Sequence, residues 1–270
     1  MKLFPQDNIA GYMKHIKRKT LSELKLPEQA ISKFSSETDL KKALRTLKYR
    51  DVKEKHALLV MDTGELIRAF FVNDGGRACT IPLANPVLIY FNFAQTLLKS
   101  LSETKDKLLK SFTGEEEITE DALMLFYGYF GQASSFVMML MTSMESFVNQ
   151  KLDPKLNYSK SEGNKFQRVY DYSQIQRWIP FSDKISEILD AQQNKSFKKN
   201  YPRKQQHLDN LKTLRDLIVH TKAGDKPDAY DELYKKALGF NFLDTIHAVK
   251  DFINFYEENL VEPCPCGIDN

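Results

Sequence analysis

The sequence predicts an α+β protein that is predominantly α-helical. Apolar residues recur every three or four positions over most of the chain from 87 to 260, the spacing of helices that bury one face. Short apolar runs with glycine-containing turns lie between 56 and 83 and predict strands. We therefore expect an N-terminal helix and β-meander module at 1–85, a helical bundle at 86–262 and a cysteine-containing tail at 263–270.

Composition sets limits on the class of protein. The chain has 270 residues, 42% of them hydrophobic and 28% charged, so it can bury a core. A net charge of +3 is too balanced to indicate nucleic-acid or membrane binding by bulk charge. The three cysteines, Cys79, Cys264 and Cys266, argue against a disulfide scaffold and fit a reducing compartment. We expect a soluble, cytoplasmic protein without a signal peptide or a membrane-spanning helix, which would need about 18 uncharged residues.

The N-terminal module is expected to begin with a helix and continue as strands. Residues 27–49 carry one apolar stripe with helical spacing. Two apolar runs at 57–61 and 66–72 follow, and the second leads into the turn sequence at 73–76, where two glycines supply positive φ angles. These features predict a two- or three-stranded antiparallel meander.

The helical region divides at its turn-forming residues. The stretch from 120 to 152 is apolar on more than one face, which predicts the central helix of a bundle or a dimer contact. Residues 153–178 are polar and irregular, and we expect a long connection there. The expected helices span residues 87–110, 120–152, 182–191, 202–222 and 228–260.

One polar constellation near the end of the 202–222 helix suggests chemistry. Asp216 and His220 are four residues apart and share a helix face, whereas Arg215 lies about 140° from His220 around the helix. Arg215 and His220 can still line one groove, particularly if a second copy of the helix lies opposite. A permanent cation beside an imidazole that titrates near pH 6.5 suits phosphodiester chemistry, because arginine can hold the phosphate while histidine exchanges protons.

The motif Arg215-Asp216-x-x-x-His220 resembles the Arg-polar-x-x-x-His signature of HEPN domains. The resemblance covers about 87–260 and includes an upstream long helix that carries Glu145 within the segment 143–149. It implies a HEPN-like helical bundle that dimerises and acts as a metal-independent endoribonuclease on single-stranded or loop RNA. Arg215 and His220 would then be the catalytic pair, with Asp216 orienting them and Glu145 supporting them. The resemblance also implies no cofactor, a defence or toxin–antitoxin role, and an antitoxin or other regulatory protein as a partner.

A basic segment leads directly into the motif helix. Cations and flat rings alternate in it, with Phe197 among them, which is typical of a surface that binds single-stranded RNA through phosphates and base stacking. A solvated loop would have the same composition. The candidate RNA-binding residues are Lys198, Lys199, Tyr201, Arg203, Lys204 and Lys222.

Each catalytic residue also has a structural interpretation. Asp216 and His220 can form a simple i,i+4 pair on a solvated face, Arg215 can lie along the surface, and Glu145 can neutralise a basic neighbour such as Arg215. The main alternative function is therefore a non-catalytic module that binds a nucleotide, an RNA or a protein. A third interpretation is a protein-interaction scaffold built on the methionine-rich helix and the N-terminal module.

The cysteine-containing tail resembles the opening of the SEC-C zinc motif. It supplies only Cys264 and Cys266, whereas a structural zinc site ordinarily has four ligands. We therefore expect no metal at this incomplete pair.

Overall fold

The structure, a computed structural model, describes residues 48–54, 56–60, 66–114, 118–162, 166–221 and 230–262. These residues belong to two compact units with a boundary between Asn85 and Pro86, and each unit is considered by itself. We call 48–85 the N-terminal unit and 86–262 the helical unit. Most of the helix predicted at 27–49, Lys222 and the tail at 263–270 lie outside the described residues.

The N-terminal unit contains the predicted antiparallel meander. Its three strands pair in the order β1-β2-β3, and Asp74 pairs with Arg77 across the β2–β3 turn. Gly75 and Gly76 have φ angles of +58° and +88°, as a two-residue turn that follows the strand twist requires. A short helix that the sequence did not predict precedes the sheet. The elements are α4 (Tyr49–Val52), β1 (His56–Val60), β2 (Leu66–Asp74) and β3 (Arg77–Pro82).

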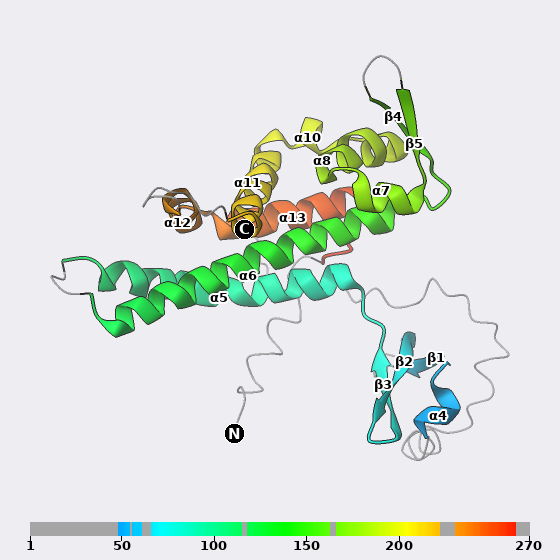
Figure 1. Cartoon of the computed structure of the whole chain (residues 1–270), viewed down its shortest axis with the longest axis horizontal. Coiled ribbons are helices and arrows are strands. Elements are labelled where there is room, and N and C mark those ends of the chain that lie inside the picture. Colours follow the sequence, from blue (N-terminus) through cyan, green and yellow to red (C-terminus); the bar gives the residue numbers. More distant parts are fainter. Residues whose placement is uncertain are drawn as a thin grey trace. The chain divides into compact units, whose positions relative to one another are not determined.

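The helical unit is a bundle organised around one long helix, α6, which contacts α5, α11, α12, α13 and η3 (Figure 1). Its largest fully buried side chains include Phe136, Phe147, Leu211 and Phe252. The predominantly helical α+β class predicted from the sequence is therefore confirmed. The elements are α5 (Pro86–Ser111), α6 (Glu120–Lys151), β4 (Tyr158–Glu162), β5 (Phe166–Tyr170), α7 (Tyr172–Trp178), α8 (Phe181–Asp183), η3 (Lys184–Leu189), α9 (Asp190–Gln193), α10 (Phe197–Asn200), α11 (Pro202–Val219), α12 (Asp231–Leu238) and α13 (Phe242–Tyr256).

Helix α6 begins where the sequence provides a cap. The Thr119 side chain accepts a hydrogen bond from the Ala122 backbone N–H at 3.2 Å, and Glu120 and Asp121 place negative charge in the first turn. Its buried side chains lie along one broad side of the helix, where the neighbouring helices pack, so the expectation of burial on more than one face was wrong.

The expectation that no uncharged stretch is long enough to span a membrane was wrong. The segment from Ala122 to Met144 carries no acidic or basic residue, and α6 is long and apolar enough to cross a membrane by length and composition. A core helix passes the same test, and α6 makes the interhelical contacts of a core helix. These contacts account for only part of its composition, because 28% of the apolar stretch is buried in the bundle.

The predicted long connection contains regular structure. Strands β4 and β5 pair as an antiparallel hairpin, and α7 follows directly. A reciprocal capping box starts α7: the Asp171 side chain accepts from the Gln174 backbone N–H, and the Gln174 side chain accepts from the Asp171 backbone N–H. The sequence shows this Asp-x-x-Gln pattern, but the polar strands lack the apolar alternation that identifies a buried strand.

Two predicted helix boundaries also need correction. The helix predicted at 228–260 is two helices, because Gly239 follows α12 and Asn241 caps α13 by accepting from the Asp244 backbone N–H at 3.1 Å. Helix α11 ends at Val219, short of the predicted residue 222, and this places His220 at its C-terminal cap.

Candidate active site on helices α6 and α11

Helix α11 holds the motif residues at the edge of the bundle. Leu208, Leu211 and Leu214 are buried in the core and fix the helix against α6 and α13. Arg215 and Asp216, which follow this apolar frame, are partly exposed. The packing of α11 therefore leaves a polar group at its C-terminal end that solvent can reach.

Arg215 connects two helices through its guanidinium. Its Nη1 donates to Asp216 Oδ1 at 3.0 Å, and its Nη2 lies 3.6 Å from Oε1 of Glu145 on α6. Lys212 Nζ donates to the other Asp216 oxygen, Oδ2, at 2.8 Å. We call Glu145, Lys212, Arg215 and Asp216 the Arg215 cluster. The structure thus brings together three predicted site residues and adds Lys212.

The Arg215 cluster retains the capacity to bind an anion. It contains two acids and two cations, so its formal charge is balanced. The guanidinium carries five N–H donors, and its two ion pairs with Asp216 and Glu145 do not use all of them. The side chain of Arg215 is 29% exposed, so part of it is open to solvent. A phosphate oxygen could therefore bind Arg215 without displacing Glu145.

His220 lies beside this cluster but is not joined to it. Its backbone N–H donates to the Asp216 carbonyl at 2.9 Å, which closes the last turn of α11. Its side chain is exposed and has no hydrogen bond or ion pair among the residues that the structure describes. The imidazole is therefore accessible to solvent.

The environment of Asp216 keeps its carboxyl ionised. Partial burial acts to raise the pKa of Asp216, but the hydrogen bonds and positive charges of Lys212 and Arg215 act more strongly in the opposite direction. The net result is a pKa below the ordinary value of 3.8. Asp216 is therefore an anionic anchor for Arg215 at neutral pH rather than a proton donor.

This pKa shift predicts a pH-dependent effect of Asp216→Asn on stability. Because the folded-state pKa is below 3.8, the ionised carboxylate stabilises the fold above that pH, and the stabilisation is lost as pH falls through the lower folded-state pKa. Asp216 is 36% exposed, so we expect Asn to lower the free energy of unfolding by less than about 1 kcal/mol at pH 7. Urea unfolding of both proteins at pH 7 and below pH 4 measures the difference. A difference that grows upon acidification would contradict this assignment.

A buried lysine near Glu145 was missed by the sequence analysis. Lys184 Nζ donates to Asn149 Oδ1 at 3.1 Å and to the Gln176 carbonyl at 2.6 Å. Burial lowers the pKa of Lys184, and the negative charge of Glu145 opposes this effect. Glu145 and Asn149 are one turn apart on α6 and so face two cations, Arg215 and Lys184. Only the i,i+4 spacing of Glu145 and Asn149 was visible in the sequence.

The candidate RNA-binding residues do not form one uniform surface. Phe197 is fully buried and packs against Phe252 and Phe255, so the expectation that it stacks on bases was wrong. Tyr201 is 43% exposed. Lys204 pairs with Asp251 at 2.6 Å and lies over the Tyr201 ring. The predicted residues whose side chains are exposed are Lys198, Lys199, Tyr201 and Arg203.

The described residues contain no group of three or more His, Cys, Asp or Glu side chains that could hold a metal ion. Cys264 and Cys266 lie outside those residues.

Comparisons with family models, curated proteins and solved structures give no match for this chain. The functional assignment consequently depends on the motif and on the geometry of Glu145, Arg215, Asp216 and His220.

Proposed function

We propose that this protein is a HEPN-type, metal-independent endoribonuclease that cleaves single-stranded or loop RNA. The observation that carries the proposal is the position of Arg215, which pairs with Glu145 from α6 and Asp216 from α11 and lies five residues before an exposed His220. A cation that can stabilise phosphate charge and an exposed imidazole on the same helix supply two groups that phosphodiester transfer uses.

The proposed reaction uses the RNA 2′-hydroxyl as the nucleophile. Its oxygen bonds to the adjacent phosphorus as the bond from phosphorus to the 5′-oxygen breaks. The products are a 2′,3′-cyclic phosphate and a 5′-hydroxyl. Arg215 would stabilise the negative charge that grows on the phosphate oxygens, while His220 would transfer a proton from the attacking oxygen or to the leaving oxygen.

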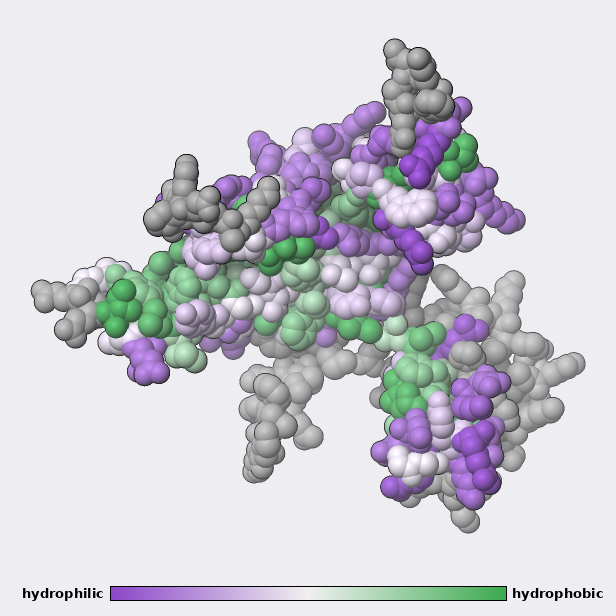
Figure 2. Space-filling model, in the orientation of Figure 1, coloured by the Kyte–Doolittle hydropathy of each residue, from purple (hydrophilic) through white to green (hydrophobic). Residues whose placement is uncertain are grey.

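The proposal includes a homodimer in which two α11 ends share one cleft. His220 has no side-chain partner in the described part of a single chain, and a second copy would supply a second imidazole for the opposite proton transfer. Apolar side chains also remain exposed at the α5–α6 end of the unit (Figure 2), and they form a separate candidate interaction surface because this end lies far along α6 from Glu145. They include Leu109, Phe112, Leu123, Met124 and Tyr127. A regulatory protein, such as an antitoxin, could restrain the activity by covering the cleft.

Incubation of the purified protein with mixed RNA in EDTA tests the proposed function. We expect cleavage fragments that end in 2′,3′-cyclic phosphate and begin with 5′-hydroxyl, because the 2′-oxygen attacks and no metal is needed. The same RNA with 2′-O-methyl groups should remain intact. Cleavage that requires a divalent metal or leaves a 5′-phosphate would contradict the mechanism.

Among the described residues, His220 has no side-chain hydrogen bond or ion pair with the Arg215 cluster, which also favours a second candidate, a non-catalytic module that binds RNA or a nucleotide. In that case Arg215 would contact phosphate and no turnover would occur. Salt-sensitive RNA binding without cleavage by the wild-type protein in the same assay would favour this alternative.

A further inference from the structure

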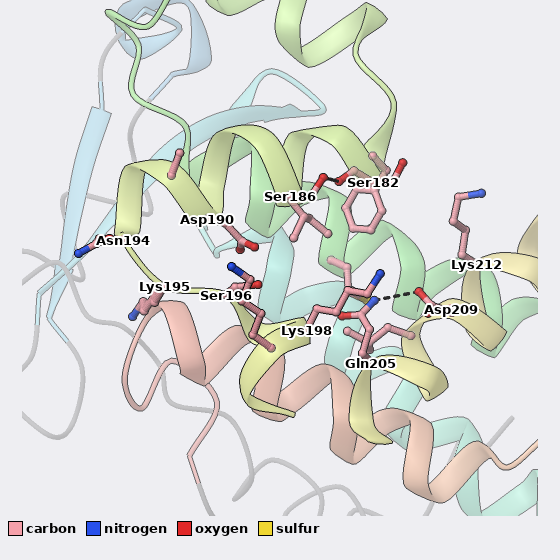
Figure 3. Close-up of a pocket in the computed structure, with 16 residues that line it drawn as sticks. Ser182, Ser186, Asp190, Asn194, Lys195, Ser196, Lys198, Gln205, Asp209 and Lys212 are labelled. Carbon is pink, nitrogen blue, oxygen red and sulfur yellow. Dashed lines mark hydrogen bonds between the residues drawn. The ribbon is translucent and has the colours of Figure 1, made fainter. Parts of the chain in front are cut away.

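A pocket of about 670 Å³ lies beside the Arg215 cluster, between the α8–η3–α9 segment and the α10–α11 segment (Figure 3). Its size falls within the usual range for small-ligand sites. Met144 of α6 contributes to its lining and is adjacent in sequence to Glu145. The pocket and the Arg215 cluster therefore lie along the same part of α6.

The lining combines an apolar part with hydrogen-bonding groups. Its apolar side chains are Met144, Phe181, Ile185 and Leu208. Figure 3 shows Ser182 and Ser186 on one side and Gln205 and Asp209 on the other. A flat ring with polar edges suits such a pocket, because its faces contact apolar side chains while its edge atoms form hydrogen bonds.

The two acids that line the pocket are already engaged. Asp190 accepts a hydrogen bond from the Tyr256 hydroxyl, and Asp209 accepts one from Gln205 Nε2 at 2.8 Å. Among the cations, Lys195 is also engaged, because its Nζ donates to the Phe255 carbonyl at 2.5 Å.

Lys198 and Lys199 differ from these residues. Their side chains are exposed, and neither has a hydrogen bond or ion pair among the described residues. Lys212, also in the lining, pairs with Asp216. The edge formed by α10 thus presents two positive charges without an ion pair among the described residues, which favour an anionic group on the ligand at that edge.

One wall of the pocket is a π-helix, a rare element that is frequent at functional sites. Ile185 and Ser186 of this wall line the pocket, while Lys184, which precedes them, binds Asn149 of α6 at 3.1 Å. The anchor on α6 holds the wall in place, so the pocket is formed without a ligand.

We infer that this pocket is a nucleotide-binding site. The base occupies the apolar part between Phe181, Ile185 and Leu208, and the phosphate binds at Lys198 and Lys199. A free nucleotide and one nucleotide of an RNA strand share this chemistry.

The inference that the bound nucleotide belongs to an RNA strand rests on the proposed function and extends it. Lys212 lines the pocket and donates to Asp216, which in turn holds Arg215. Lys212 and Arg215 are three residues apart, or about 4.5 Å along the helix axis. A strand with one base in the pocket would therefore reach Arg215 with a neighbouring phosphate.

Titration calorimetry with adenosine and uridine 5′-monophosphates in EDTA tests whether the pocket binds nucleotides. The protein is the His220→Ala variant, so that RNA cleavage plays no part in the measurement. We expect saturable binding that weakens by roughly tenfold or more with the phosphate-free nucleosides and in the Lys198→Gln/Lys199→Gln variant. The matched control is Lys107→Gln/Lys110→Gln, which removes the same charge from exposed positions on α5 and should change affinity by less than about twofold. Circular dichroism verifies that each variant folds.

Two further measurements separate the possible outcomes. Ser186→Trp, which fills the pocket, should abolish nucleotide binding. A 2′-O-methyl hexanucleotide that displaces the mononucleotide identifies RNA as the source, whereas failure to compete identifies a free nucleotide. No saturable binding at millimolar nucleotide, or equal affinity in the two lysine variants, would overturn the inference. Because the binding assay involves no cleavage, the pocket and the nuclease proposal can fail independently.

Discussion

Replacement of His220 by alanine is expected to lower RNA cleavage by about 10²- to 10⁴-fold, because a general acid or base contributes a factor of this size. The side chain is exposed at the end of α11 and forms no described side-chain hydrogen bond or ion pair that folding would lose. We therefore expect little change in thermal stability. Cleavage rates and melting curves of the two proteins, measured in EDTA, separate a catalytic effect from a folding defect.

The matched control for this prediction is His207→Ala. His207 lies on the same helix, outside the Arg215 cluster and the nucleotide pocket. The His207→Ala protein should therefore cleave RNA at close to the wild-type rate. A pH profile adds an independent measurement, because a rate that depends on one acting imidazole follows its protonation, and this dependence should be lost in His220→Ala. Equal cleavage by wild type and His220→Ala would exclude His220 as the acid or base.

Much of the fold could be predicted because it depends on strong local patterns. The apolar stripes of α5 and α6 and the glycine turn at Gly75 and Gly76 are periodic or stereochemical signals within one short stretch. The β4–β5 hairpin and the π-helix have no comparable signal. Their formation depends on contacts from elsewhere, such as the one between Lys184 and Asn149, which the sequence does not display.

In the candidate site, too, the residues with a local sequence pattern were predicted, and the contacts between distant segments were not. The motif indicated Arg215, Asp216 and His220, and the i,i+4 spacing of Lys212 and Asp216 was also available in the sequence. The contact between Arg215 and Glu145 joins helices that are distant in the chain, so it could be proposed as an option but not established. The nucleotide pocket was not visible at all, since five elements and a helix irregularity form it.

Replacement of Arg215 by alanine is expected to lower cleavage by about 10²- to 10³-fold, the usual loss when one donor to a developing charge is removed. Lysine at this position keeps the charge but not the planar fork that contacts Asp216 and Glu145, so Arg215→Lys should retain intermediate activity. Arg177→Ala is the matched control, because Arg177 is exposed on α7 and lies outside the site. The rates of single-turnover cleavage by Arg215→Ala, Arg215→Lys and Arg177→Ala, compared with wild type, measure these effects.

A double-mutant cycle then tests whether Glu145 acts through Arg215. If Glu145 only positions the guanidinium, Glu145→Gln should slow cleavage in the wild-type background and have no further effect in Arg215→Ala. RNA affinity, measured over a range of salt concentrations, should lose part of its salt dependence in Arg215→Ala, because one phosphate contact is removed. Additive effects of the two substitutions would show that Glu145 has a role independent of Arg215, and the proposed positioning contact across α6 and α11 would have to be abandoned.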